Sequence, residues 1–179
     1  MSQPPIGPYF LSPAACHDYD PRAPRVAQRV ALLMTEQLPT LVVEHIGSSS
    51  VPGCAGKGIV DLMVLYPSGQ LEATKHVLET LGFQRQTTQD PLPEERPMRT
   101  GTFEYDGSIF RLHAHVIGAD SSEVEELRTF RERLCADPDL VAAYIARKRA
   151  IIASGITDEG EYATAKGSFV QDALSDEAR

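Results

Sequence analysis

The chain has 179 residues, a formal net charge of −8 and a hydrophobic content of 42%. This length is enough for one domain with a buried core, and the acidic balance argues against general binding to the nucleic-acid backbone. The absence of Trp excludes recognition by Trp stacking. The charge is uneven, however, because 10 of the 17 Lys and Arg residues lie between Arg96 and Lys166. A local cluster of basic side chains is therefore compatible with a surface that is acidic elsewhere.

The cysteine pattern and the hydropathy of the chain indicate its cellular compartment. Cys16, Cys54 and Cys135 are odd in number, far apart and form no Cys-x-x-Cys pair, which argues against a disulfide framework or a structural zinc site. No apolar run approaches the ~18 residues of a membrane span, and the N-terminus lacks a signal-peptide pattern. We expect a cytoplasmic protein with no membrane partner.

Proline marks the beginning of the chain as irregular. Residues 1–24 carry six of the thirteen prolines, and proline serves neither a strand ladder nor a helix interior. We therefore expect an irregular N-terminal arm over residues 1–18, lying on the surface of a single domain over residues 19–175.

Apolar periodicity predicts alternating helices and strands in the first half of the domain. Two runs rich in β-branched residues are typical of buried strands, and a loop of Gly, Ser and Pro separates them. Pro39 and Gly82 follow the two expected helices, as helix-ending residues do. In chain order we expect a helix over 22–38, strands over 41–46 and 59–65, a helix over 71–81 and a short strand over 83–85.

A hairpin follows a long polar loop. Residues 86–100 are proline-broken and predicted to be a loop, whereas Asp106-Gly107 is a strong hairpin turn between strands over 102–105 and 108–117. The second strand alternates, so His113 and His115 point to the same face of the sheet.

The last third of the chain is predicted to be helical. Ser122 and Glu125 form a capping box ahead of one helix, and Asp137-Pro138 opens a second that ends near Ser154. Thr157 is expected to cap a third helix. Together the elements predict an α+β fold, a mixed β-sheet flanked by helices with a helical C-terminal third.

The loop that follows the first strand is a candidate phosphate site. Gly47, Ser48 and Ser49 offer backbone N–H groups and hydroxyls to an anion, and Lys57 lies a few residues further on. The alternative is an ordinary turn with a capping serine. The stretch is not a Walker loop, because no Gly-Lys-Ser/Thr follows four residues after a glycine.

Asp61, His113 and His115 are candidate metal ligands. Asp61 interrupts an apolar strand, where an unpaired carboxylate is unfavourable, so it belongs either to a site or to a solvated sheet face. Two histidines on one strand face suit two metal ligands, or a ligand and a base, but also a pair of hydrogen-bonded side chains. His45 flanks the Gly-Ser turn and is available to the same pocket.

Three cations of the helical third are candidate anion ligands. Arg131, Lys148 and Lys166 fall on or beside apolar helix stripes, and each lysine shares its helix face with a tyrosine four residues earlier. Cations directed inward suit a polyphosphate. Alternatively, their aliphatic stems cover apolar surface.

These residues resemble the signature of the GrpB family. The resemblance spans residues 19–169, and its long central motif is specific. It is carried by Glu44 to Gly53, Lys57, Ile59-Val60-Asp61, Tyr19-Asp20-Pro21, the His113-x-His115 strand, Leu127, Phe130-Arg131, and the Tyr144/Lys148 and Tyr162/Lys166/Phe169 spacings.

The resemblance implies a nucleotidyltransferase-like fold, in which the Gly-Ser turn holds nucleotide phosphates and acidic residues on neighbouring strands hold a divalent metal. This chain departs from the nucleotidyltransferase pattern at Met63, where the second carboxylate of the metal pair is expected. A thioether is a poor ligand for Mg²⁺, so His113 and His115 favour Mn²⁺ or Zn²⁺ beside Asp61.

Three functions remain open at this point. The leading one is a metal-dependent nucleotidyl or phosphoryl transferase that uses Mg²⁺, Mn²⁺ or Zn²⁺, takes a nucleoside triphosphate and acts on a small molecule. In it His45, or a histidine that is not a metal ligand, is available as a base. The second is a non-catalytic nucleotide- or anion-binding module that has lost its second metal ligand. The third is a metal-dependent hydrolase or isomerase built on Asp61, His113 and His115.

Overall fold

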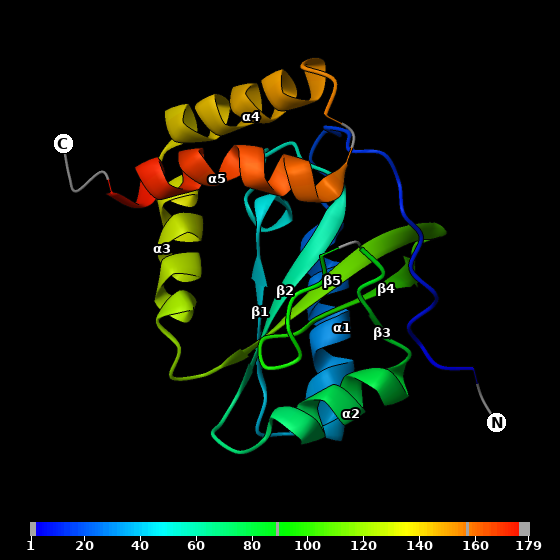
Figure 1. The fold of residues 1–179 in the computed structure, drawn as a ribbon. Helices are drawn as coiled ribbons and strands as arrows, with labels where there is room; N and C mark the ends of the chain where they lie inside the picture. Colours follow the sequence, from blue (N-terminus) through cyan, green and yellow to red (C-terminus); the bar gives the residue numbers. More distant parts are fainter. Residues whose placement is uncertain (1–2, 89, 157, 176–179) are drawn as a thin grey trace.

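The computed structural model describes residues 3–88, 90–156 and 158–175. In this part of the chain five strands form one mixed sheet with helices packed around it, as predicted (Figure 1). The elements are α1 (Ala23–Gln37), β1 (Val42–Ile46), the 3-10 turn η1 (Ser48–Ser50), β2 (Ile59–Tyr66), α2 (Leu71–Leu81), β3 (Gln84–Arg85), β4 (Met98–Tyr105), β5 (Ser108–Gly118), α3 (Ser122–Ala136), α4 (Pro138–Ala153) and α5 (Glu159–Ser175).

The sheet order β1-β2-β5-β4-β3 brings distant parts of the sequence together. β1 and β2 are antiparallel, whereas β2 and β5 are parallel, and the crossover between them contains α2. In this register Asp61 of β2 lies beside Ile46 of β1 on one side and beside His113 of β5 on the other. The pairing thus places the end of β1 next to the middle of the sheet.

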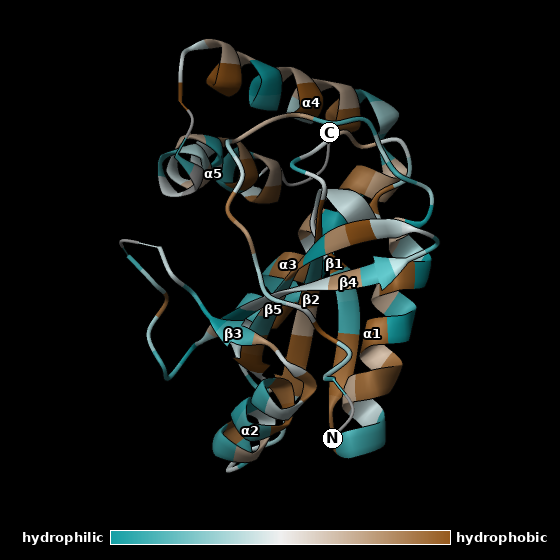
Figure 2. Cartoon of the chain, turned by 90° about the vertical axis from the view of Figure 1, so that its right-hand side faces the viewer, coloured by the Kyte–Doolittle hydropathy of each residue, from teal (hydrophilic) through white to brown (hydrophobic). Residues whose placement is uncertain are grey.

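The two faces of the central strands differ in chemistry. On one face Leu62 of β2 and Leu112 of β5 are fully buried in the main core beneath α1 and α2. Burial of each such side chain stabilises the fold by about 1.5–3 kcal/mol. Brown and teal residues alternate along α1 in Figure 2, as expected for a helix with one buried face. The other face carries Asp61 and the two histidines, and then a smaller apolar cluster under α3.

The C-terminal helices lie across one end of the sheet (Figure 1). Asp137 caps α4 as predicted, because its side chain accepts from the backbone N–H groups of Asp139 and Leu140 at 2.9 and 3.1 Å. Tyr144 of α4 packs edge-on to Phe130 of α3 and stacks on Phe169 of α5. This aromatic contact joins the three helices.

The N-terminal arm is tied to the sheet rather than laid loosely over the surface. Ile6 is 2% exposed and its N–H donates to the Leu81 carbonyl, while Gly7 pairs with Thr102 of β4. Glycine is required at position 101 where the arm packs on β4, because a Cβ there would overlap the Ile6 side chain. A second bridge joins His17 to Gly56. The arm is therefore fixed at both of its ends.

Apart from shifts of one residue or so at other ends, the start of β4 and the cap of α3 differ from the sequence prediction. β4 begins at Met98 rather than at residue 102, because its first residues pair with both β3 and β5, which shortens the preceding loop to 86–97. The cap of α3 is Ser121 rather than Ser122, since the Ser121 side chain accepts from the Glu123 N–H. The predicted cap Thr157 lies outside the described residues.

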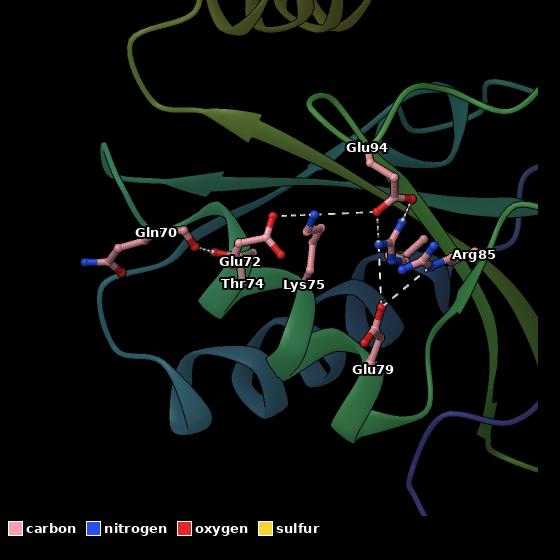
Figure 3. A network of polar contacts seen from close by, with 8 residues as sticks. Gln70, Glu72, Thr74, Lys75, Glu79, Arg85 and Glu94 are labelled. Carbon is pink, nitrogen blue, oxygen red and sulfur yellow. Dashed lines mark hydrogen bonds and ion pairs between the residues drawn. The ribbon is translucent and has the colours of Figure 1, made fainter.

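The loop 86–97 is held by ion pairs on two sides. Glu94 accepts from both terminal nitrogens of Arg99, at 3.1 and 2.8 Å, and lies 3.6 Å from Lys75 of α2 (Figure 3). Arg96 pairs with Glu123 of α3. Arg99 is 1% exposed, and the Glu94 carboxylate compensates the charge of its buried guanidinium.

Within the described residues, no helix combines the length and the apolar character that crossing a bilayer requires.

Candidate metal and phosphate site

A cleft of about 1090 Å³ opens over the polar face of the sheet. Its walls come from the arm, the loop after β1, the loop 86–97 and the first half of α5. Two of the predicted site residues, His45 and Arg131, do not line it. The predicted residues that do are Gly47, Ser48, Ser49, Lys57, Asp61, His113, His115, Lys148 and Lys166.

Asp61, His113 and His115 meet on the floor of the cleft. The Asp61 carboxylate lies 3.5 Å from His113 Nδ1 and 3.6 Å from His115 Nε2. The side chains are only partly exposed, Asp61 by 26%, His113 by 10% and His115 by 23%. The parallel pairing of β2 with β5 produces this arrangement, because it sets Asp61 directly opposite His113.

The electrostatics of the cluster favour the metal-binding forms of Asp61 and His115. Burial opposes ionisation of Asp61, but its interactions with His113 and His115 outweigh burial and hold the pKa of Asp61 below its ordinary value. Burial lowers the pKa of His115. A charged carboxylate and a neutral imidazole are the forms that bind metal ions.

The three side chains fit a divalent cation. Each offers one donor atom, and the three atoms lie within 4.8 Å of one another. One carboxylate and two imidazoles suit Mn²⁺ or Zn²⁺ better than Mg²⁺, which prefers oxygen ligands in an octahedral arrangement. Three protein ligands also leave coordination positions for a substrate.

Met63 has no place in this ligand set. It is fully buried among Leu65, Ile117 and Val124 beneath α3. Because this position faces the helix rather than the cleft, β2 contributes a single carboxylate to the floor.

Gly47 brings the loop backbone against the Asp61 carboxylate. Its φ of 71° and ψ of −172° fall in a region that is essentially restricted to glycine. A Cβ at this position would lie 2.6 Å from Asp61 Oδ2. Conformation and space therefore both require glycine here. Ser48 and Ser49 follow Gly47 in the sequence, so the loop begins beside the Asp61 carboxylate.

His45 lies behind that loop rather than in the cleft. Its Nε2 is 2.9 Å from the Ser49 hydroxyl. Burial lowers the pKa of His45 to about 4, with a smaller lowering by Arg131 and an opposing effect of Asp61. The ring is therefore neutral near pH 7, and a base of such low pKa accepts a proton poorly. Its geometry suits the orientation of Ser49.

Lys148 fastens the same loop from beneath. The side chain is 1% exposed, and its ammonium donates to Ser48 Oγ at 2.9 Å, to the Ala55 carbonyl and to Cys54 Sγ at 3.4 Å. These contacts use the three donors of the ammonium group. Burial lowers the pKa of Lys148. Lys148 thus adds positive charge to the site while it holds the loop in shape.

The remaining cations divide into two groups. Lys57 and Lys166 both lie over the ring of Tyr162, at 5.2 and 6.0 Å from its centre, and both line the cleft. Arg131 instead contacts Glu44 at 3.3 Å and the His45 carbonyl at 3.1 Å. Its guanidinium joins α3 to β1.

Tyr9 is the site residue that sequence reasoning missed. Its hydroxyl lies 3.0 Å from His113 Nε2, on the side of the ring away from Asp61. The proline-rich arm shows no periodicity, and no pattern in the sequence pairs residue 9 with residue 113. The bridge from Gly7 to β4 and the hydrogen bond from the Tyr9 N–H to Gln84 bring them together.

The fold is that of a nucleotidyltransferase-like protein. The chain resembles the crystal structure of a conserved GrpB protein from Enterococcus faecalis with a TM-score of 0.66 at 22% identity, over 89% of this chain and 97% of that one. It also resembles Cid1, solved in complex with its short product ApU, with a TM-score of 0.51 at 14% identity, over 75% of this chain and 42% of Cid1.

The sequence comparison gives the family. The family described as GrpB protein matches residues 13–176, and the chain belongs to it. A UPF0157 protein of Streptomyces coelicolor is 32% identical over 157 residues, which cover 86% of this chain and 78% of that protein. A UPF0157 protein of Halalkalibacterium halodurans is 29% identical over 160 residues, which cover 88% and 78% of the two chains.

Proposed function

We propose that this protein is a metal-dependent nucleotidyl or phosphoryl transferase that acts on a small molecule in the cytoplasm. One observation carries the proposal: Asp61 is flanked by His113 and His115 on the floor of a cleft, and the Gly47 backbone packs against the same carboxylate. A cation site and a loop suited to phosphate are thereby in direct contact. The nucleotidyltransferase-like fold supports this reading.

The residues of the chain divide the work of such a reaction. Asp61, His113 and His115 would hold one Mn²⁺, Zn²⁺ or Mg²⁺. Such a cation would stabilise the negative charge that develops on a phosphate during transfer. The loop Gly47–Ser49 binds phosphate oxygens, and Lys148 keeps that loop in shape. Lys57 and Lys166 add charge further along the cleft, where the rest of a nucleoside triphosphate would extend.

A second candidate function is a nucleotide- or anion-binding module without turnover. The observation that favours it is the burial of Met63 under α3, which leaves one carboxylate where a two-metal reaction needs more. This module would bind nucleotide in the presence of EDTA, because the loop and the lysines would be sufficient.

Calorimetric titration tests the metal and the nucleotide separately. We expect the wild-type protein to bind Mn²⁺ or Zn²⁺ more tightly than Mg²⁺, and to bind a non-hydrolysable nucleoside triphosphate more tightly when the metal is present. Asp61→Asn should abolish the metal dependence. Equal nucleotide affinity with and without EDTA, and in both proteins, would exclude the metal-dependent proposal and support the binding module.

A screen for turnover tests the reaction itself. The protein is incubated with nucleoside triphosphates, a panel of phosphorylated and hydroxylated metabolites and each of the three metals, and products are followed by mass spectrometry. A nucleotidylated or phosphorylated product that disappears with Asp61→Asn supports the transferase. Hydrolysis or isomerisation of a metabolite without group transfer would contradict it.

A further inference from the structure

The arm lines one wall of the cleft and is fixed at two points. Gly7 pairs with Thr102 at one end, and His17 pairs with Gly56 at the other. Close to the first point the Tyr9 N–H donates to the Gln84 side chain at 3.0 Å. These contacts determine where the Tyr9 ring lies, and they place it against His113, with 5.5 Å between the ring centres.

We propose that Tyr9 is a positioning residue for the metal ligand His113. The inference rests on the proposed metal site at Asp61, His113 and His115. His113 presents Nδ1 to Asp61 at 3.5 Å and Nε2 to the Tyr9 hydroxyl at 3.0 Å. A histidine that binds a metal through one ring nitrogen needs a hydrogen-bond partner on the other, which fixes the tautomer and the orientation of the ring. Tyr9 supplies that partner.

A hydroxyl suits this task because it both donates and accepts. Without a metal, the tautomer of His113 that carries its proton on Nδ1 would direct that proton to Asp61, and Tyr9 would donate to the Nε2 lone pair. If His113 held a metal through Nδ1, its ring proton would reside on Nε2 and would be donated to the Tyr9 oxygen. The ring therefore keeps its partner in both states without rotation.

The hydroxyl that contacts His113 belongs to a part of the chain that lies before the residues matched by the family. That match begins at residue 13, whereas Tyr9 and its anchors Ile6 and Gly7 precede it. The seat of the anchors is closely fitted, since a Cβ on Gly7 would lie 2.7 Å from the Thr102 hydroxyl. The first segment of the chain thus contributes to the metal site.

Cobalt binding by Tyr9→Phe tests the role. Phenylalanine keeps the ring packing and removes only the hydroxyl. Loss of an outer hydrogen bond of this kind lowers metal affinity by about 10- to 100-fold. We expect that loss in a Co²⁺ titration, together with a changed visible spectrum of bound Co²⁺, which reports ligand geometry. Tyr105→Phe is the matched control, because it removes the same hydroxyl from a tyrosine that packs against the main core and does not line the cleft; its affinity and spectrum should equal those of the wild type.

Two further measurements test the same role of Tyr9 independently. In the metal-free protein, ring nitrogen shifts of His113 measured by NMR should indicate one tautomer in the wild type and a mixture in Tyr9→Phe. Gln84→Ala removes the anchor of the Tyr9 backbone from an exposed strand and should weaken Co²⁺ binding in the same direction. Absence of Co²⁺ binding by the wild type would overturn the metal site itself. Equal affinity, spectrum and tautomer in wild type and Tyr9→Phe would overturn the role of Tyr9 alone.

Discussion

The two faces of β2 and β5 are built from alternate residues of the same strands, yet they serve different ends. Leu62 and Leu112 point into the core beneath α1 and α2, where neither side chain is accessible to solvent. Asp61 and His113, their neighbours in sequence, point into the cleft. The first face holds the protein together, and the second provides the donor atoms.

This division explains how three ionisable groups are accommodated in the middle of a sheet. A charged group in an apolar core is strongly unfavourable, but the cleft leaves Asp61 partly hydrated and both histidines lie within 3.6 Å of its carboxylate. Stability and chemistry can therefore be changed separately, by substitutions one residue apart.

The largest effect on stability is expected on the apolar face. Leu112→Ala leaves a cavity under α1 and should lower the free energy of unfolding by about 2–5 kcal/mol, measured by urea denaturation. The metal affinity of the folded fraction should remain that of the wild type. A large loss of affinity in this variant would mean that the two faces are coupled.

On the polar face, a substitution at Asp61 should affect metal affinity more than stability. Asp61→Asn keeps the shape of the side chain but removes the charged ligand, so Mn²⁺ or Zn²⁺ affinity should fall by more than about 100-fold, beyond the effect of losing an outer partner. The metal-free protein should lose about 1–3 kcal/mol of unfolding free energy, because the ionised carboxylate is stabilised in the folded state. Calorimetry and urea denaturation check the two halves of this prediction.

Gly47 is the position at which the two properties meet. Gly47→Ala must adopt a backbone conformation reserved for glycine, which destabilises by about 1–3 kcal/mol, and its methyl group displaces the Asp61 carboxylate. We expect both the melting temperature and the metal affinity to fall.

Gly53→Ala separates the two causes. Gly53 also has a positive φ, of 76°, but a Cβ there would have no neighbour within 4 Å. This variant should lose stability and retain metal affinity. If it lost affinity as much as Gly47→Ala does, contact with Asp61 would not be the reason.

The smallest effect concerns the attachment of α3 to the sheet. A hydrogen bond from Arg128 lowers the pKa of Glu44, with further lowering by Arg131. Because the folded pKa lies below the ordinary value of 4.5, the pair stabilises the protein above that pH and the contribution is lost as the pH falls through the folded pKa. The difference in melting temperature between wild type and Glu44→Gln should be greatest near neutral pH and shrink below pH 4.5. A constant difference across this range would contradict the assignment.

Local patterns in the sequence were sufficient for most of the fold. β-branched runs, the Asp106-Gly107 turn and the Asp137 cap predicted the elements around them, because each depends on neighbouring residues. The alternation of β5 predicted that His113 and His115 share one face, and both lie beside Asp61 on the floor of the cleft.

Contacts between distant segments were beyond such patterns. The first residues of β4 read as loop, because Met98 and Thr100 gain their strand conformation by pairing with β5. Lys148 was expected to face an anion, but its ammonium is directed to the loop Ser48–Ala55, a contact that only the packing of α4 establishes. The approach of Tyr9 to His113 spans 104 residues and left no trace in the composition of either segment.

The anchoring of the arm has a consequence for the order in which the protein matures. The arm is synthesised before the groups that receive it, because Gln84 is 75 residues beyond Tyr9 and His113 is 104 residues beyond it. The arm must therefore wait, undocked, while α2 and the hairpin are made and folded. The arm is therefore among the last segments to dock, and His113 gains its contact with Tyr9 only when it does.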